Sequence, residues 1–258
     1  MLAERYDAFL FDLDGVLYRG AEATPGAAAA LARLRAAGKG LAFVTNNSSR
    51  TPEDVADHLS SLGVVASPDE VETSSLVTAS LLRERGVATA FVVGETGLTT
   101  ALREHGIETI HGEPDRADVV VVGWDRSADY AKLRTASLLV QRGASLVATN
   151  ADASFPAPDG RWPGAGAFLA VIEITTGVSA EVIGKPHAPI FLAALERAGG
   201  GRPLVIGDRL DTDIAGAAAL GWDSLLVLTG ISTSDEAAVA TQRPTHVGKD
   251  LMVLFDDA

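Results

Sequence analysis

The stretch Ala8-Phe9-Leu10-Phe11-Asp12-Leu13-Asp14-Gly15 decides the fold class. Its apolar residues, 8–11, predict a buried strand, and the carboxylates of Asp12 and Asp14 follow that strand directly. Further strand-sized apolar runs alternate with helical patterns along the rest of the chain. Such alternation is typical of parallel sheets that are covered by helices. The sequence therefore predicts an α/β fold with a parallel-sheet core.

The same patterns locate the individual elements. A cap-and-proline start at Thr24-Pro25 predicts a helix over 25–37, and Thr51-Pro52 predicts another that runs to Leu62. The predicted strands are residues 8–11, 40–44, 89–93, 118–122, 145–148, 203–206 and 224–228.

The interval between Thr45 and Lys185 is too long for a single crossover connection, and it contains a strand–helix alternation of its own. We therefore expect a second α/β domain inserted into the first. The predicted boundaries are residues 1–78 and 184–258 for the core domain and residues 79–183 for the insert.

Asp12 and Asp14 stand two residues apart on a strand-to-loop turn, where Gly15 allows the chain to turn sharply. One carboxylate can attack phosphorus and form an aspartyl-phosphate. The other can protonate the leaving group and then activate water. The alternative is an ordinary acidic turn after a strand.

Polar clusters follow two other predicted strands, and one lysine follows a third apolar run. Thr45-Asn46-Asn47 offers hydroxyl, amide and backbone donors for phosphoryl oxygens, or else caps the next helix. Lys185 could neutralise a phosphate, or else be a solvated charge. Ligands of parallel sheets bind beyond the carboxyl ends of the strands, so we expect these clusters to meet there.

Asp208 and Asp213 follow the strand predicted at 203–206. Carboxylate oxygens at a strand end suit Mg²⁺, which needs few protein ligands. The alternative is an acidic start to the next helix, favoured by its dipole.

Composition excludes several function classes. Lys and Arg number 21 against 34 Asp and Glu, a net charge of −13, which disfavours binding to nucleic-acid polymers. With no cysteine, thiol catalysis and cysteine-ligated metals are excluded.

The five histidines lack metal-ligand spacing, and we find no P-loop, HExxH or GxSxG motif. No apolar run is long enough to span a membrane and no secretory signal is evident, so we expect a cytoplasmic protein.

Taken in order, Asp12-x-Asp14-Gly, Thr45-Asn46, Lys185 and Gly207-Asp208-x4-Asp213 resemble the haloacid dehalogenase (HAD) superfamily, whose core is Rossmann-like. The large insert resembles that of the NagD-like, p-nitrophenyl phosphatase branch. Three more segments share this likeness: residues 148–152, residues 163–167 and Leu228-Thr229-Gly230-Ile231.

The resemblance implies a role for each matched residue. Asp12 would be the nucleophile and Asp14 the general acid and base. The ligands of Mg²⁺ would be Asp12, the Asp14 carbonyl and Asp208, and Asp213 would either bind the ion or orient its waters. Thr45, Asn46 and Asn47 would bind the phosphoryl group, with Lys185 offsetting its charge.

The inserted domain would be a cap that selects the substrate. Asn150 and Asp152 follow one of its predicted strands. They could contact substrate hydroxyls, or else stabilise their own loop. The substrates implied are small phosphorylated metabolites: phosphoglycolate, glycerol phosphate, nucleotides or p-nitrophenyl phosphate. The resemblance also implies a homodimer formed through the cap.

Two other functions remain open at this point. A phosphotransferase on the same fold would pass the phosphoryl group to another acceptor. A non-catalytic phosphate-binding regulatory protein would have no need of both Asp12 and Asp14.

Overall fold

The computed structural model describes residues 1–157 and 159–256, so residue 158 of the predicted insert and residues 257–258 of the predicted core lie outside the described residues. The chain divides into two compact units. The core unit comprises residues 1–45, 52–72 and 185–258, and the insert unit comprises residues 46–51 and 73–184.

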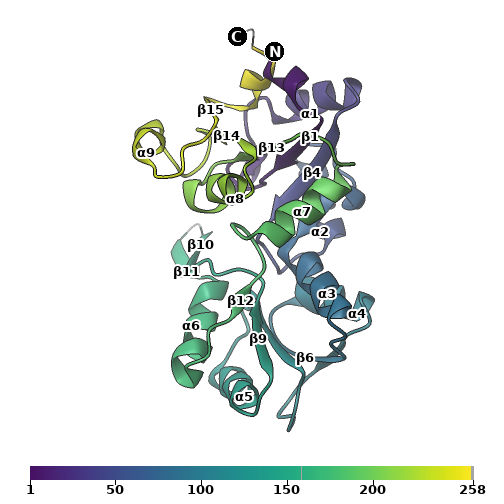
Figure 1. Cartoon of the computed structure of the whole chain (residues 1–258), viewed down its shortest axis with the longest axis vertical. Helices are drawn as coiled ribbons and strands as arrows, with labels where there is room; N and C mark the ends of the chain where they lie inside the picture. Colours follow the sequence, from purple (N-terminus) through teal and green to yellow (C-terminus); the bar gives the residue numbers. More distant parts are fainter. Residues whose placement is uncertain (158, 257–258) are drawn as a thin grey trace. The chain divides into compact units, whose positions relative to one another are not determined.

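A six-stranded sheet forms the centre of the core unit (Figure 1). Strand β1 pairs in parallel with β13 on one side and with β4 on the other. Phe11 at the end of β1 is opposite Ile206 and Phe43, so all three strands end at the same edge. In spatial order the strands are β15 (His246–Gly248), β14 (Asp223–Val227), β13 (Pro203–Gly207), β1 (Ala8–Phe11), β4 (Gly40–Thr45) and β5 (Val71–Thr73).

Helices pack on this sheet, and the strand residues alternate between its faces. Phe9 and Phe11 belong to a buried cluster with Leu31 and Leu34, whereas Leu10 between them does not. The core helices are α1 (Ala27–Ala36), α2 (Pro52–Ser61), α7 (Ala188–Arg197), α8 (Ala215–Ala219) and α9 (Ser234–Val239). Shorter elements are the hairpin of β2 (Tyr18–Arg19) and β3 (Glu22–Ala23), the 3₁₀ turns η1 (Leu2–Arg5), η2 (Pro68–Glu70) and η4 (Leu251–Phe255), and the π-helical turn η3 (Leu210–Ile214).

The insert unit has its own five-stranded parallel sheet. Its strands, in spatial order, are β12 (Glu181–Val182), β9 (Ser145–Ala148), β8 (Val119–Val122), β6 (Thr89–Val93) and β7 (Glu108–Ile110). Its helices are α3 (Ser74–Glu84), α4 (Thr96–Glu104), α5 (Tyr130–Gln141) and α6 (Ala165–Thr176). An antiparallel hairpin of β10 (Ser154–Ala157) and β11 (Gly160–Pro163) completes the unit.

The α/β fold with two parallel sheets is confirmed, and each predicted strand is present within a residue or two. The predicted start of the first helix is wrong. Gly26, with a left-handed φ of 80°, is the N-cap residue of α1, and no side chain caps it. The Thr24 hydroxyl instead donates to the Val16 carbonyl, outside the helix.

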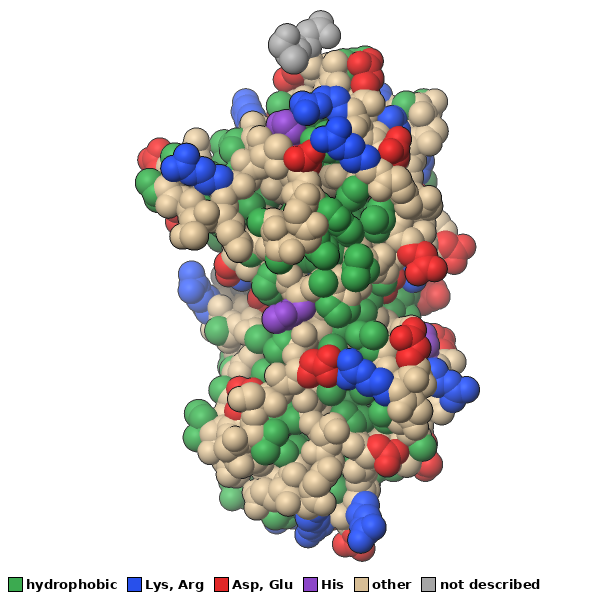
Figure 2. Space-filling model, in the orientation of Figure 1, with side chains coloured by type: hydrophobic (Ala, Val, Ile, Leu, Met, Phe, Trp, Pro, Cys, Tyr) green, Lys and Arg blue, Asp and Glu red, His purple; other side chains and the backbone are tan. Residues whose placement is uncertain are grey.

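Within residues 1–157 and 159–256, no helix is long and apolar enough to cross a membrane. On the face shown in Figure 2, acidic and basic side chains are interspersed rather than separated by sign.

Candidate active site

Three aspartates converge beyond the carboxyl ends of two adjacent core strands. Asp12 follows β1 and its backbone N–H donates to the Ile206 carbonyl of β13 (2.8 Å), which places it beside the end of β13, where Asp208 follows. Asp213 lies on η3, directly after that strand. One carboxylate oxygen from each of the three lies within 4.8 Å of the others.

Lys185 lies among these carboxylates. Its Nζ donates to Asp12 Oδ1 (2.5 Å) and to Asp213 Oδ1 (2.8 Å), and its side chain is only 5% exposed. Burial alone would lower the pKa of Lys185, but the two carboxylates together raise it. The lysine is therefore cationic at any working pH.

The single cation Lys185 does not balance the charges of three clustered carboxylates. Burial raises the pKa of Asp12, Asp208 and Asp213 to about 6 in each case. The charge of Asp208 raises the pKa of Asp12 further, and the charge of Asp213 raises the pKa of Asp208 further. The charge of Lys185 lowers the pKa of both Asp12 and Asp208. The cluster without a metal therefore holds protons more tightly than ordinary aspartates do.

The arrangement fits Mg²⁺. Asp208 Oδ2 accepts from the Ile231 backbone N–H (2.8 Å), but the buried Oδ1 has no hydrogen-bond partner among the residues described. A buried carboxylate oxygen without a donor is costly, and a divalent cation supplies the missing partner. The three clustered side chains offer carboxylate oxygens, which is the ligand chemistry that Mg²⁺ prefers.

Two glycines make room for Asp208. Gly15 has a left-handed φ of 83°, and a Cβ there would collide with the Asp208 carboxylate. A Cβ on Gly230 would collide with the same side chain. Thr229 joins the two loops, because its hydroxyl donates to the Gly15 carbonyl. The loops after β1 and β14 thus enclose Asp208 closely.

Unlike Asp12, Asp208 and Asp213, the Asp14 residue is exposed, and it lies outside the cluster of three carboxylates. It forms a β-bridge with Tyr18, at the start of the β2–β3 hairpin. Partial burial raises its pKa, while Arg19 and His58 act in the opposite direction. A carboxyl group with a raised pKa that water can reach is suited to giving and taking protons.

The predicted phosphate-binding segment is divided between the two units. Thr45 is the buried last residue of β4 in the core unit. Asn46 and Asn47 belong to the insert unit. Asn47 Oδ1 accepts from the backbone N–H (3.0 Å) and the hydroxyl (2.7 Å) of Ser49.

The two predicted substrate contacts of the insert unit, Asn150 and Asp152, hydrogen-bond with Asn46. Asn150 Nδ2 donates to the Asn46 carbonyl (2.8 Å), and Asn46 Nδ2 donates to Asp152 Oδ2 (3.1 Å). Asn150 is 4% exposed and Asp152 is half-buried.

Sequence reasoning assigned no role to Gly230, Ile231 or Thr229, which surround Asp208 and Gly15. The only signal for them was the resemblance of the segment 228–231 to the family. His187, the one histidine near Lys185 in sequence, is exposed at the start of α7.

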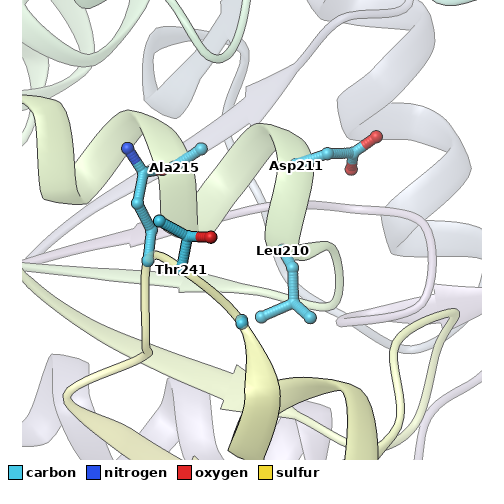
Figure 3. A pocket seen from close by; sticks show the side chains of 6 residues that line it. Leu210, Asp211, Ala215 and Thr241 are labelled. Atoms are coloured by element: carbon cyan, nitrogen blue, oxygen red, sulfur yellow. The ribbon is translucent and has the colours of Figure 1, made fainter.

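A pocket of about 340 Å³ lies elsewhere on the core unit (Figure 3). Its lining residues come from the turn η3, helix α8 and the segment 240–242, and they do not include the three clustered aspartates. Asp211 lines it, but that carboxylate already accepts two hydrogen bonds from Arg209.

Comparisons with known proteins agree with this geometry. Residues 9–108 match the model of a haloacid dehalogenase-like hydrolase family, and residues 182–254 match a HAD-hydrolase-like model. The chain is 39% identical, over 96% of either chain, to the acid sugar phosphatase of Staphylococcus aureus.

Two solved structures are also similar. The glycerol phosphate phosphatase of Mycobacterium tuberculosis in complex with magnesium has a TM-score of 0.94 at 37% identity, over 99% of this chain and 78% of that one. NagD from E. coli K-12 has a TM-score of 0.89 at 31% identity, over 97% of this chain and 98% of that one. The strand-end aspartates, the two parallel sheets and these relatives together establish that the chain belongs to the haloacid dehalogenase-like hydrolases, in the NagD and p-nitrophenyl phosphatase branch.

Proposed function

We propose that this protein is a Mg²⁺-dependent phosphatase that hydrolyses small phosphomonoesters through an aspartyl-phosphate on Asp12. One observation carries the proposal: the carboxylates of Asp12, Asp208 and Asp213 converge on Lys185, and one oxygen of Asp208 is buried without a donor. Asp208 and Asp213, with Asp12 and the Asp14 carbonyl, would hold the metal. A Mg²⁺ ion held by these residues would offset the negative charges of the nucleophile and the phosphate.

The residues divide the chemistry between them. A carboxylate oxygen of Asp12 attacks phosphorus, and the bond from phosphorus to the ester oxygen breaks. Asp14 gives its proton to that leaving oxygen. Asp14 then takes a proton from water, whose oxygen attacks the phosphorus of phospho-Asp12. This second attack releases inorganic phosphate and restores Asp12.

Binding of the phosphoryl group is assigned to Thr45, Asn46 and Asn47, with Lys185 as the resident cation. Lys185 already bonds to Asp12, so it also orients the nucleophile. These groups recognise features that every phosphomonoester shares, and they cannot discriminate between esters.

Discrimination between esters is therefore assigned to the insert unit, which would act as a cap. Two relatives are named for their action on sugar phosphates and glycerol phosphate, so we infer a phosphorylated polyol or sugar as the substrate class. Phosphoglycolate, nucleotides and p-nitrophenyl phosphate complete the set to be tested.

The test is a panel of these esters with Mg²⁺, in which the phosphorus-containing products are identified. We expect inorganic phosphate, released fastest from a sugar or polyol phosphate. A new phosphate ester in place of inorganic phosphate would make the protein a phosphotransferase. No turnover of any ester would favour a phosphate-binding regulatory protein.

We also propose that the protein is cytoplasmic and that it forms a homodimer through the insert unit. Exposed apolar side chains on the insert helices, Tyr130 and Leu138 on α5 and Val171 and Ile174 on α6, support association through that unit. Light scattering at micromolar concentration tests it, and a monomer mass would contradict it.

A further inference from the structure

The boundary between the two units falls inside the phosphate-binding motif, between Thr45 and Asn46. The segment 46–51 is attached to the insert unit by hydrogen bonds along its length. Ser75 Oγ donates to the Ser48 carbonyl (2.9 Å), and the Trp124 backbone N–H donates to Ser48 Oγ (3.1 Å). The conformation of this half of the motif is therefore set by the insert unit.

Asn46 itself is held at both its backbone and its side chain. Its carbonyl accepts from Asn150 Nδ2 (2.8 Å) and from Ser74 Oγ (2.9 Å). Its side-chain Nδ2 donates to Asp152 Oδ2 (3.1 Å). A Cβ on Gly184 would collide with the Thr149 carbonyl and crowd Asn46 Oδ1, so the chain packs closely on this asparagine from another side.

The polar groups of Asn150 are already used. Its Nδ2 donates to the Asn46 carbonyl and, over a longer distance, to Thr149 Oγ1 (3.4 Å), while its Oδ1 accepts from the Asp152 backbone N–H (3.1 Å). At 4% exposure it has little surface to offer a ligand. The bond from the Asp152 N–H to Asn150 also fixes the loop that brings the Asp152 carboxylate to Asn46.

We propose that Asn150 and Asp152 are positioning residues that fix the conformation of Asn46 for phosphoryl binding, rather than contacts that select the organic part of the ester. This inference rests on the proposed function, because it takes Asn46 to bind phosphate. Part of the insert unit would then support phosphoryl binding, which every substrate requires.

The consequence is a loss shared by all substrates. If Asn46 is misplaced, every ester binds its phosphoryl group less well, whatever its leaving group. Displacing a substrate-positioning group by about 1 Å can cost on the order of 100-fold in rate. We therefore expect Asn150→Ala and Asp152→Ala to lower kcat/KM roughly 10- to 100-fold, by the same factor for each ester.

The experiment compares these two variants with Asp152→Asn and with Asp129→Ala. Asp152→Asn keeps an oxygen that can accept from Asn46, so it should recover most of the loss. Asp129 caps α5 by accepting from the Lys132 N–H (2.8 Å), and it has no bond to the segment 46–51. Asp129→Ala therefore controls for lost stability of the insert unit alone.

The donors are glycerol phosphate, which carries hydroxyls, and p-nitrophenyl phosphate and acetyl phosphate, which do not. Binding of inorganic phosphate in the presence of Mg²⁺, measured by calorimetry, is the second readout and needs no turnover. We expect Asn150→Ala and Asp152→Ala to weaken phosphate binding and to lower kcat/KM equally for all three donors, with melting temperatures no lower than that of Asp129→Ala.

Losses confined to glycerol phosphate, with phosphate binding unchanged, would make the two residues substrate contacts and overturn the inference. Equal kinetic losses in Asp129→Ala would reduce their role to general stability and also overturn it. A wild-type protein without turnover would contradict the proposed function separately, and phosphate binding would still decide the inference.

Discussion

Lys185 is the residue on which the charge balance of the site depends. Its buried ammonium group donates hydrogen bonds to two of the three clustered carboxylates. Lys185 is also the first residue of the core unit after the insert unit. Removing one partner of a buried ion pair typically costs about 3–5 kcal/mol, because the remaining charge is left uncompensated.

We expect Lys185→Met to lower the free energy of unfolding of the metal-free protein by about 3–5 kcal/mol at neutral pH. The loss should shrink near pH 5, where the carboxylates can take up protons, and Mg²⁺ should restore part of it. Urea denaturation with and without Mg²⁺ measures both effects. Lys132→Met is the matched control, since Lys132 pairs with the buried Asp125 in the insert unit (2.7 Å). It should lose stability that Mg²⁺ does not restore.

The same carboxylates give the site a predictable response to pH. Burial raises the pKa of Asp12, Asp208 and Asp213 to about 6, so protons occupy the ligand oxygens below that pH. A metal requires its carboxylate ligands deprotonated, and protons and Mg²⁺ therefore compete. Calorimetry should show Mg²⁺ affinity at least about tenfold weaker at pH 5 than at pH 7, with little change above pH 7. An affinity independent of pH over this range would mean that these aspartates do not bind the metal.

At the scale of elements, the loops after β1 and β14 must leave enough space for the Asp208 side chain. Gly15 combines a left-handed φ with a close approach to Asp208. Gly38, after α1, has a left-handed φ of 68° but open space around the position of a Cβ. An alanine at Gly38 would introduce backbone strain alone, whereas an alanine at Gly15 would introduce both backbone strain and a collision with Asp208.

We expect Gly38→Ala to cost about 1 kcal/mol of stability and to leave Mg²⁺ binding unchanged. Gly15→Ala should cost that much or more and should also weaken Mg²⁺ binding, because the new methyl group displaces Asp208. Calorimetric titration with Mg²⁺ and thermal unfolding of both variants test this. Equal Mg²⁺ affinities in the two variants would contradict the role given to this loop.

The sequence could place the aspartates because each follows a run of apolar residues, and parallel strands end at one edge. It could not show Gly230 against Asp208, since that contact depends on how two loops fold. The start of α1 was predicted wrongly for a similar reason. Thr24 has the residue type of a cap, but the N-cap is Gly26, and the Thr24 hydroxyl donates to the Val16 carbonyl outside the helix.

At the scale of the molecule, the long interval between two motifs predicts an insert, and the chain divides into two compact units. The interval was not enough to predict that the short segment 46–51 belongs to that insert. The bond between Asn46 and Asp152 joins residues 106 positions apart, and no local pattern in either segment encodes it. The division of the segment Thr45-Asn46-Asn47 between two units therefore became visible only in the structure.

The most direct test of the account is to trap the phosphoenzyme. Acid-quenching the protein during turnover of ³²P-labelled acetyl phosphate with Mg²⁺, followed by peptide mapping, locates any covalent phosphate. We expect label on the peptide that contains Asp12, no label when Mg²⁺ is chelated, and neither label nor turnover in Asp12→Asn. Label on another peptide, or turnover by Asp12→Asn at a rate near that of the wild type, would contradict the mechanism.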